Sequence, residues 1–182
     1  MQDRYEVRLA GEGGQGLILA GLILAEAAAI YDDKNAAQTQ SYGPEARGGA
    51  SKSEVVISDG EIDYPKVIKA DVLLTLGQEA CDKYFHELKK GGVLIVDSVN
   101  VERVPTTRAY QVPITQLAEE ATGRRITANI VGLGLLVGLT GVVSRKAVEA
   151  AVKARAPKGT EKLNLKALAA GFKKAEELKR KE

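Results

Sequence analysis

A glycine-rich stretch near the start of the chain limits the fold more than any other feature of the sequence. Before it, Tyr5, Val7 and Leu9 alternate with mostly charged residues, a pattern typical of a β-strand with one buried face. Residues 11–16 then read Gly-Glu-Gly-Gly-Gln-Gly, and residues 17–30 are rich in Ala, Leu and Ile. Together these segments predict a strand, a tight turn and a buried helix.

Strand and helix signals continue to alternate along the chain. We expect extended segments at about 35–40, 52–58, 71–76, 92–97 and 108–112, and helices near 78–89 and 114–122. The apolar runs at 71–76 and 93–96 are continuous, as expected for strands covered on both faces of a parallel sheet. The sequence therefore predicts an α/β, Rossmann-like fold: a single doubly wound, mostly parallel sheet flanked by helices, with a helical C-terminal region.

The chain has 182 residues, which is enough for one domain with a substantial core. We expect a single domain over residues 1–182, with the sheet core at about 1–143 and C-terminal helices at about 144–182. The last helix should begin near Asn164, because an apolar stripe at helical spacing starts there.

Residues 126–143 carry no charged side chain. Eighteen residues of this kind reach the lower limit for a membrane-spanning helix. Basic residues flank both ends and glycines dilute the apolarity, so a helix buried against the sheet is favoured. Gly132, Gly134 and Gly138 would allow its neighbours to approach closely, and Ser144 is predicted to cap the next helix.

Cys81 is the only cysteine and His86 the only histidine. One cysteine excludes an internal disulfide and any iron–sulfur cluster held by this chain alone, since such clusters need about four thiolates. Cys81, Tyr84, Phe85 and Leu88 share one helical stripe, which favours core packing over a reactive thiol. His86 lies off this stripe and is expected to face solvent. The N-terminus has charges where a signal peptide would be apolar, so we expect a cytoplasmic protein.

Charge is unevenly distributed along the chain. Residues 144–182 carry 12 Lys or Arg against 5 Asp or Glu, which leaves 14 against 19 in residues 1–143. A basic helical tail could bind nucleic acid or an acidic partner, but Phe172 is its only aromatic residue. We favour a solvated face, and expect neither nucleic acid nor a membrane as a partner.

Gly11, Gly13 and Gly16 match the G-x-G-x-x-G pattern between a strand and a helix. In that setting glycine lets backbone N–H groups and a helix N-terminus approach an anion. An acidic residue about 20 positions later would complete a ribose clamp. Asp32 and Asp33 are near that place, yet they lie in a polar turn before the second strand. NAD or flavin binding is therefore a minor alternative, and the glycines could equally serve only to close the turn.

Residues 38–53 read Gln-Thr-Gln-Ser-Tyr-Gly-Pro-Glu-Ala-Arg-Gly-Gly-Ala-Ser-Lys-Ser. The segment is long and polar for a connection, and such loops are usually functional. Pro44 fixes one backbone dihedral and Gly43, Gly48 and Gly49 permit unusual ones near Arg47, which suits an anionic or planar partner. In the alternative interpretation Arg47 forms a structural ion pair with Glu45 or Glu54.

Four stretches of the chain resemble the gamma subunit of 2-oxoacid:ferredoxin oxidoreductases: residues 11–16, 38–49 and 53–59, and Ile62-Asp63-Tyr64-Pro65. The version Gln-Ser-Tyr-Gly-Pro-Glu-Ala-Arg-Gly-Gly is similar to the 2-oxoglutarate branch. The pyruvate branch usually has an aromatic-rich stretch followed by Glu-Arg-Arg-Gly. The resemblance is strongest over residues 5–100.

This resemblance implies a subunit of an enzyme that oxidatively decarboxylates 2-oxoglutarate with coenzyme A, giving succinyl-CoA, carbon dioxide and reduced ferredoxin. It implies alpha and beta subunits and a ferredoxin-like delta subunit as partners, and ferredoxin through the complex. Thiamine diphosphate with Mg²⁺ and the iron–sulfur clusters would lie in those subunits, so this chain alone would bind no cofactor and be inactive. The alternatives are a gamma subunit for pyruvate or another 2-oxoacid, an independent NAD- or flavin-binding protein, and a scaffold module.

No catalytic residue can be assigned from the sequence, and no metal site is expected. The candidates for ligand or interface contacts lie in the two glycine-rich segments: Gly11, Gly13, Gly14, Gln15, Gly16, Gln40, Ser41, Tyr42, Gly43, Pro44, Glu45, Arg47, Gly48 and Gly49.

Overall fold

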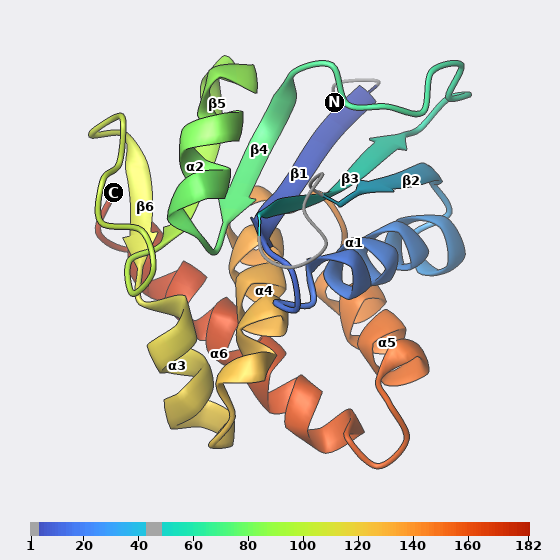
Figure 1. The fold of residues 1–182 in the computed structure, drawn as a ribbon. Helices are drawn as coiled ribbons and strands as arrows, with labels where there is room; N and C mark the ends of the chain where they lie inside the picture. The colour runs from blue at the N-terminus through green and yellow to red at the C-terminus, as the bar shows by residue number, and fades with distance from the viewer. Residues whose placement is uncertain (1–3, 43–48) are drawn as a thin grey trace.

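The computed structural model describes residues 4–42 and 49–182, and its elements alternate as predicted (Figure 1). The strands are β1 (Arg4–Glu12), β2 (Asn35–Ser41), β3 (Ala50–Ser58), β4 (Ala70–Thr75), β5 (Leu88–Asp97) and β6 (Ala109–Val112). The helices are α1 (Leu17–Glu26), α2 (Gln78–Tyr84), α3 (Ile114–Thr122), α4 (Ala128–Thr140), α5 (Arg145–Arg155) and α6 (Glu161–Lys179). A π-helical turn, Ala27–Tyr31, continues α1.

The strands form one six-stranded sheet in the order β2-β3-β1-β4-β5-β6. Within the part β1-β4-β5-β6 each strand is parallel to its neighbour, whereas β3 is antiparallel to both β1 and β2. The α/β class with a mostly parallel sheet is confirmed. Strand β3 reverses because only eight residues separate it from β2, and a parallel crossover needs a dozen or more. The strands other than β3 therefore end at one edge, here called the carboxyl edge.

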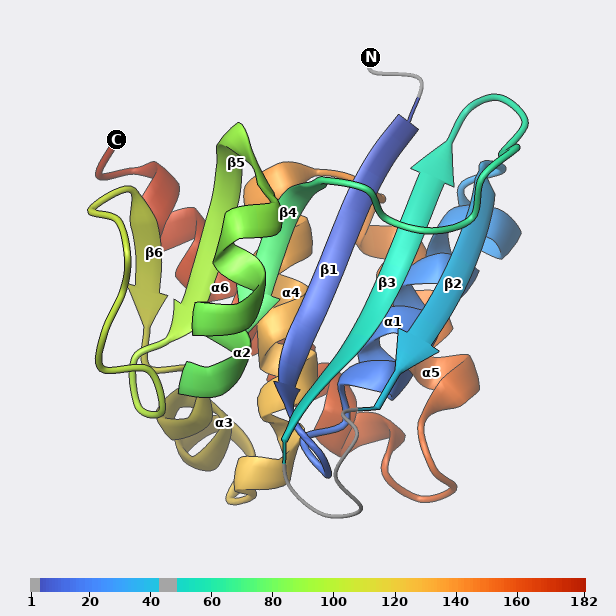
Figure 2. The same cartoon turned by 45° about the horizontal axis from the view of Figure 1, so that its top comes forward.

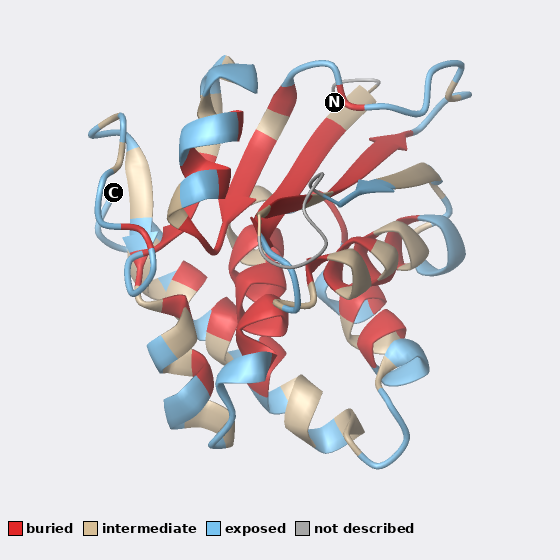
Figure 3. Ribbon diagram, in the orientation of Figure 1, coloured by how far each residue is buried: buried red, intermediate tan, exposed pale blue. Residues whose placement is uncertain are grey.

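The helices lie unequally on the two faces of this sheet. Helices α1, α3, α4, α5 and α6 lie on one face, while α2 covers part of the other (Figures 1 and 2). Helix α4 is the centre of the larger core, and every residue from Ala128 to Val137 is buried (Figure 3). The predicted buried helix at 126–143 is thus confirmed, although a 3₁₀ turn takes up Arg125–Thr127 before α4 begins.

Close approach explains the glycines of α4. A Cβ atom at Gly132 would lie 2.9 Å from the Leu74 side chain, and one at Gly134 would lie 2.4 Å from the Leu168 carbonyl oxygen. The latter contact is with backbone of α6, which cannot give way easily. In the described residues, no helix combines the length and apolarity that crossing a bilayer requires.

The predicted helix at 78–89 is wrong over its last residues. Helix α2 ends at Tyr84, and Leu88 already belongs to β5, where it pairs with Ala70 of β4. The main-chain hydrogen bonds of the sheet outweigh the helical spacing of the apolar side chains. Those side chains still pack together, because Cys81 and Tyr84 are buried in one cluster and Phe85 and Leu88 pack against it.

Two helix starts can be compared with their predictions. Helix α5 begins after Ser144, whose hydroxyl accepts a hydrogen bond from the Ala147 backbone nitrogen at 3.1 Å, so the predicted N-cap is confirmed. Helix α6 begins at Glu161, earlier than the expected start near Asn164. The first two residues of this helix, Glu161 and Lys162, are charged, so the apolar stripe gives no signal there.

Candidate functional site

The structure brings the two predicted glycine-rich segments to the same place. Glu12, the last residue of β1, pairs with Ala50, the first residue of β3, and β2 ends beside them (Figure 2). The turn at 11–16, the residues 40–42 and Gly49 therefore all lie at the carboxyl edge. The remaining candidates, Gly43, Pro44, Glu45, Arg47 and Gly48, lie outside the described residues.

The side chain of Gln15 closes the glycine-rich turn from within. The backbone nitrogen of Glu12 donates to Gln15 Oε1 at 2.7 Å, and Gln15 Nε2 donates to the Leu76 carbonyl oxygen at 3.1 Å. A Cβ atom at Gly11 would lie 2.2 Å from Gln15 Oε1. The Gln15 amide thus fills the inside of the turn and joins the end of β1 to the end of β4.

A second amide side chain fixes the turn to α4. Gly14 and Gly16 have φ angles of 89° and 74°, in the left-handed region that favours glycine. The buried Asn129, in the first turn of α4, donates from Nδ2 to the Gly16 carbonyl oxygen at 2.9 Å. A Cβ atom at Gly16 would lie 2.5 Å from this Nδ2. The starts of α1 and α4 are therefore held together without any charged group.

A surface hollow of about 260 Å³ opens beside this turn. It is lined by the turn, the ends of β4 and β5 and the starts of α3 and α4: Gly14, Gln15, Leu76, Asn100, Thr115, Arg125, Ile126 and Ala128. Among these described residues Arg125 is the ionisable one. Its Nε lies 3.3 Å from Glu119 Oε2 and its side chain is mostly exposed. The hollow can accept an anionic group, but the described residues of its lining offer no acid–base pair for catalysis.

Asp97 holds two of the residues that line the hollow, Asn100 and Thr115. It is fully buried at the end of β5, and its carboxylate accepts hydrogen bonds from Asn100 Nδ2 at 2.9 Å and from the Thr115 backbone nitrogen at 3.3 Å. The Thr115 hydroxyl donates to the same carboxylate. With the Val99 backbone nitrogen, which donates at 3.2 Å, four donors satisfy the buried charge, so Asp97 fixes the loop after β5 to the start of α3.

The geometry argues against a dinucleotide at the turn. Asp32 and Asp33 precede β2, so they lie at the edge of the sheet opposite the one where β2 and the turn end. Asp32 accepts hydrogen bonds from the Ser144 backbone nitrogen and hydroxyl, both at 2.6 Å. The ribose clamp of the NAD alternative therefore does not form, and Gln15 occupies the space inside the turn.

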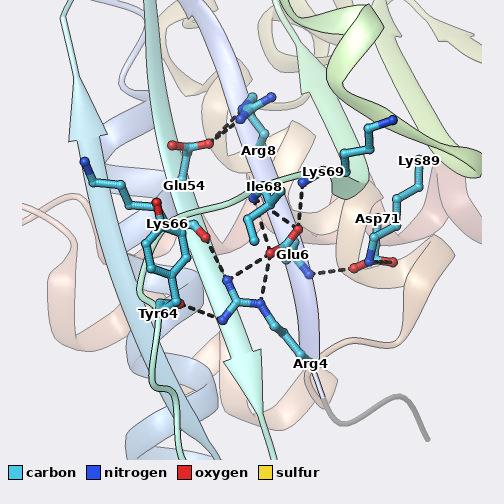
Figure 4. Close-up of polar contacts among 10 residues, drawn as sticks. All are labelled: Arg4, Glu6, Arg8, Glu54, Tyr64, Lys66, Ile68, Lys69, Asp71 and Lys89. Atoms are coloured by element: carbon cyan, nitrogen blue, oxygen red, sulfur yellow. Dashed lines mark hydrogen bonds and ion pairs between the residues drawn. The ribbon is translucent and has the colours of Figure 1, made fainter.

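The sheet face that α2 partly covers carries a buried ion-pair cluster, which lies against Tyr84 of α2 (Figure 4). Arg8 of β1 lies with its Nη2 2.6 Å from Glu54 Oε2, and it also pairs with Glu87. The guanidinium carbon lies 5.3 Å from the centre of the Tyr84 ring. Lys52 Nζ approaches the other Glu54 oxygen at 3.2 Å. Glu54, one of the two partners considered for Arg47 in the segment before β3, thus already holds two cations.

Sequence reasoning missed several polar residues of the carboxyl edge: Asp97, Asn100, Thr115, Arg125 and Asn129. Asn129 stands out as an amide in the charge-free run, and Asp97 ends an apolar run, but both signals are weak. No group of three or more His, Cys, Asp or Glu side chains suited to a metal ion occurs within residues 4–42 and 49–182. Cys81 is buried, and burial raises the pKa of its thiol.

Comparison with known proteins identifies the family of this chain. Residues 6–174 match the family described as pyruvate ferredoxin/flavodoxin oxidoreductase, and the chain belongs to this family. The 2-oxoglutarate synthase subunit KorC of Methanocaldococcus jannaschii is 55% identical over 179 residues, which cover 96% of each chain. The solved gamma subunit of a keto/oxoacid ferredoxin oxidoreductase from Geobacter sulfurreducens is 56% identical, with a TM-score of 0.87, and the match covers 96% of this chain and 97% of that one.

A more distant relative carries a similar sequence within a longer chain. Ketoisovalerate oxidoreductase subunit VorA of Methanothermobacter thermautotrophicus is 35% identical over 176 residues. The match covers 94% of this chain and 36% of VorA. Most of VorA therefore lies outside the region that corresponds to this protein.

Proposed function

We propose that this chain is the gamma subunit of a 2-oxoglutarate:ferredoxin oxidoreductase. The complex would oxidatively decarboxylate 2-oxoglutarate with coenzyme A, giving succinyl-CoA, carbon dioxide and reduced ferredoxin. The full-length identity of 55% to a 2-oxoglutarate synthase subunit carries the proposal, because the identity to a ketoisovalerate subunit is 35%. Pyruvate or another 2-oxoacid is the second candidate substrate.

Within this complex the chain has a binding role. Thiamine diphosphate with Mg²⁺ and the iron–sulfur clusters belong to the alpha, beta and ferredoxin-like delta subunits, and ferredoxin receives electrons through the complex in the cytoplasm. Two properties of the chain support this division of labour: it has one cysteine, and the described lining of its hollow lacks an acid–base pair.

The carboxyl edge is the surface that we assign to these partners. The described residues give no steric reason for Gly13: its φ is not positive, and none of them lies within 4 Å of where its Cβ would be. Approach of another molecule to the bare backbone supplies that reason. Gln15 and Asn129 hold the turn in place for this contact, and the described residues 40–42 and 49 extend it.

Arg125 is the group that we assign to coenzyme A. Its side chain is mostly exposed at the rim of the hollow, and a guanidinium forms strong, paired hydrogen bonds with phosphate. Replacing Arg125 with Ala should raise the KM for coenzyme A of the assembled enzyme and leave the KM for 2-oxoglutarate unchanged. Arg103→Ala is the matched control, because Arg103 is also exposed in an ion pair. An unchanged KM for coenzyme A would reject this role.

Reconstitution with one subunit omitted tests the function as a whole. The complete set of subunits should reduce an electron acceptor with 2-oxoglutarate and coenzyme A, and omission of this chain should abolish that activity. Pyruvate and branched-chain 2-oxoacids serve as competing substrates in the same assay. Full activity without this chain, or faster turnover of another 2-oxoacid, would contradict the proposal.

A further inference from the structure

The segment between β3 and β4 crosses the same sheet face as α2, over the part that this helix leaves uncovered. Residues 59–69, here called the β3–β4 strap, contain no helix or strand. They run over the starting half of β1, away from the carboxyl edge (Figure 2). The strap includes Ile62-Asp63-Tyr64-Pro65, which the proposed function leaves without a role.

Two charged side chains of β1 hold the strap in a fixed position (Figure 4). Arg4 donates from Nη1 to the Tyr64 carbonyl oxygen at 2.6 Å and from Nη2 to the Lys66 carbonyl oxygen at 2.7 Å. The buried Glu6 carboxylate accepts from Arg4 Nε at 2.9 Å and from the Ile68 backbone nitrogen at 3.3 Å. Because a buried carboxylate is costly unless it is bonded, these contacts define one position for the strap backbone.

The strap presents different side chains to its two sides. Val67 is buried with Val56 of β3, and Ile62 packs against them, so these residues complete a small core. On the outer side, Tyr64 is 49% exposed and Ile68 is 67% exposed. These outer side chains add little to the burial of the free chain, although the backbone that carries them is firmly held. A rigid backbone with exposed apolar side chains is the form expected of a preorganised protein-binding surface.

We propose that the β3–β4 strap docks another polypeptide of the same enzyme: the subunit that corresponds to the part of VorA lying outside the match to this chain. In VorA that part and this domain are covalently joined, since the match covers 36% of VorA. As a separate subunit it must be held by non-covalent contacts, and an aromatic and an aliphatic anchor on a fixed backbone supply them. This inference rests on the proposed function, because it places the chain in a multisubunit enzyme of this family.

Ile68→Glu and Ile30→Glu form a matched pair for testing the surface. Ile68 is 67% exposed on the strap, and Ile30 is 68% exposed on the π-helical turn after α1. Each tagged variant is co-expressed with the other subunits, and the recovered partner is quantified. Ile68→Glu should lower partner recovery by more than about tenfold, as for a central anchor of an interface, and Ile30→Glu should stay near wild type. The isolated variants should both melt at the wild-type temperature.

Tyr64→Asp repeats the test if Ile68→Glu lowers the melting temperature. Wild-type recovery with both strap variants, or equal losses with Ile30→Glu, would overturn the proposal. A strap-dependent dimer of the isolated chain in size-exclusion chromatography would also overturn it, because the occupant would then be a second copy. If the wild-type complex assembles through the strap but does not turn over 2-oxoglutarate, the proposed substrate fails and the docking surface stands.

Discussion

The two ends of β1 are built with opposite chemistry. At its start, the charged side chains of Arg4, Glu6 and Arg8 are satisfied by other charges and by backbone groups. At its end, the neutral amides of Gln15 and Asn129 close a turn made largely of glycine. A strand of nine residues thus supports the β3–β4 strap at one end and the exposed backbone of the glycine-rich turn at the other.

This contrast shows how each end can serve a different contact. Arginine and glutamate reach far enough to fix an irregular strap above the sheet, and their mutual pairing limits the cost of burial. Amide side chains can both donate and accept, so they fix the turn without adding a charge beside the hollow. We therefore expect substitutions of the buried charges to affect the stability of the free chain most, and substitutions of exposed residues in the strap and the turn to affect assembly most.

The largest effect on stability is expected for Arg8→Met. This change leaves Glu54 and Glu87 without their shared buried cation, and removing one partner of a buried ion pair typically costs about 3–5 kcal/mol. Urea unfolding of the isolated chain measures it. Arg103→Met is the control, since Arg103 pairs with Asp82 at the surface and should contribute less than about 1 kcal/mol. Equal losses for the two variants would remove the distinction between buried and exposed pairs.

A smaller and non-additive effect is expected at the neutral end. Gln15→Ala removes the two hydrogen bonds that close the turn and should cost about 1–2 kcal/mol. Gly11→Ala should cost a similar amount, because its Cβ must displace Gln15 Oε1. Once one change has displaced the Gln15 amide, the other adds little. The double variant should therefore lose less stability than the sum of the losses of the two single variants. Strict additivity in urea unfolding would show that Gln15 does not fill the turn.

Alkaline pH should lower the unfolding free energy of the chain through Tyr5, which lies in β1 beside Arg4 and Glu6. Burial, followed by the nearby charge of Asp71, raises the pKa of Tyr5 to about 12 from 10.0. The folded pKa is higher than the unfolded one, so this contribution to stability is complete below pH 10 and is lost as the pH rises towards 12. The unfolding free energy of Tyr5→Phe should therefore fall less than that of wild type over this range. Parallel curves would contradict the assignment.

The smallest effect on the free chain is expected for Gly13→Ala. Its φ is not positive and its Cβ would meet none of the described residues within 4 Å, so the change should be neutral or stabilise the chain by up to about 1 kcal/mol. Assembly with the other subunits should nevertheless weaken, since the added methyl group lies where a partner approaches the turn. Thermal unfolding and partner recovery measure the two effects separately. Normal recovery would remove Gly13 from the interface.

Local signals in the sequence predicted much of the fold. The strand, turn and helix at the N-terminus, the buried α4 and the Ser144 cap each depend on residues close together in the chain. The place of β3 between β2 and β1 and the start of β5 at Leu88 depend on pairing between distant strands, and spacing alone does not reveal them. The α/β class was therefore predictable, whereas the strand order and some boundaries were not.

The candidate site, like the fold, was predictable from the sequence only where its signals are local. Glycine punctuation identified the turn at 11–16 and the loop after β2, and the structure places the described parts of both at one edge. The roles of Asn129 and Asp97 depend on where α4 and β5 end up relative to the turn. Arg8 gave no signal at all, because a charged residue in an alternating strand normally faces water.

Hydrogen exchange of this chain, free and within the assembled complex, tests the central claim most directly. If the two ends of β1 face other subunits, assembly should slow exchange at the backbone amides of Gly13 and Gly14 and in the β3–β4 strap. Amides on the solvent-facing side of α6 should exchange at the same rate in both states. Protection confined to α5 and α6, with unchanged exchange at the turn and the strap, would contradict the account.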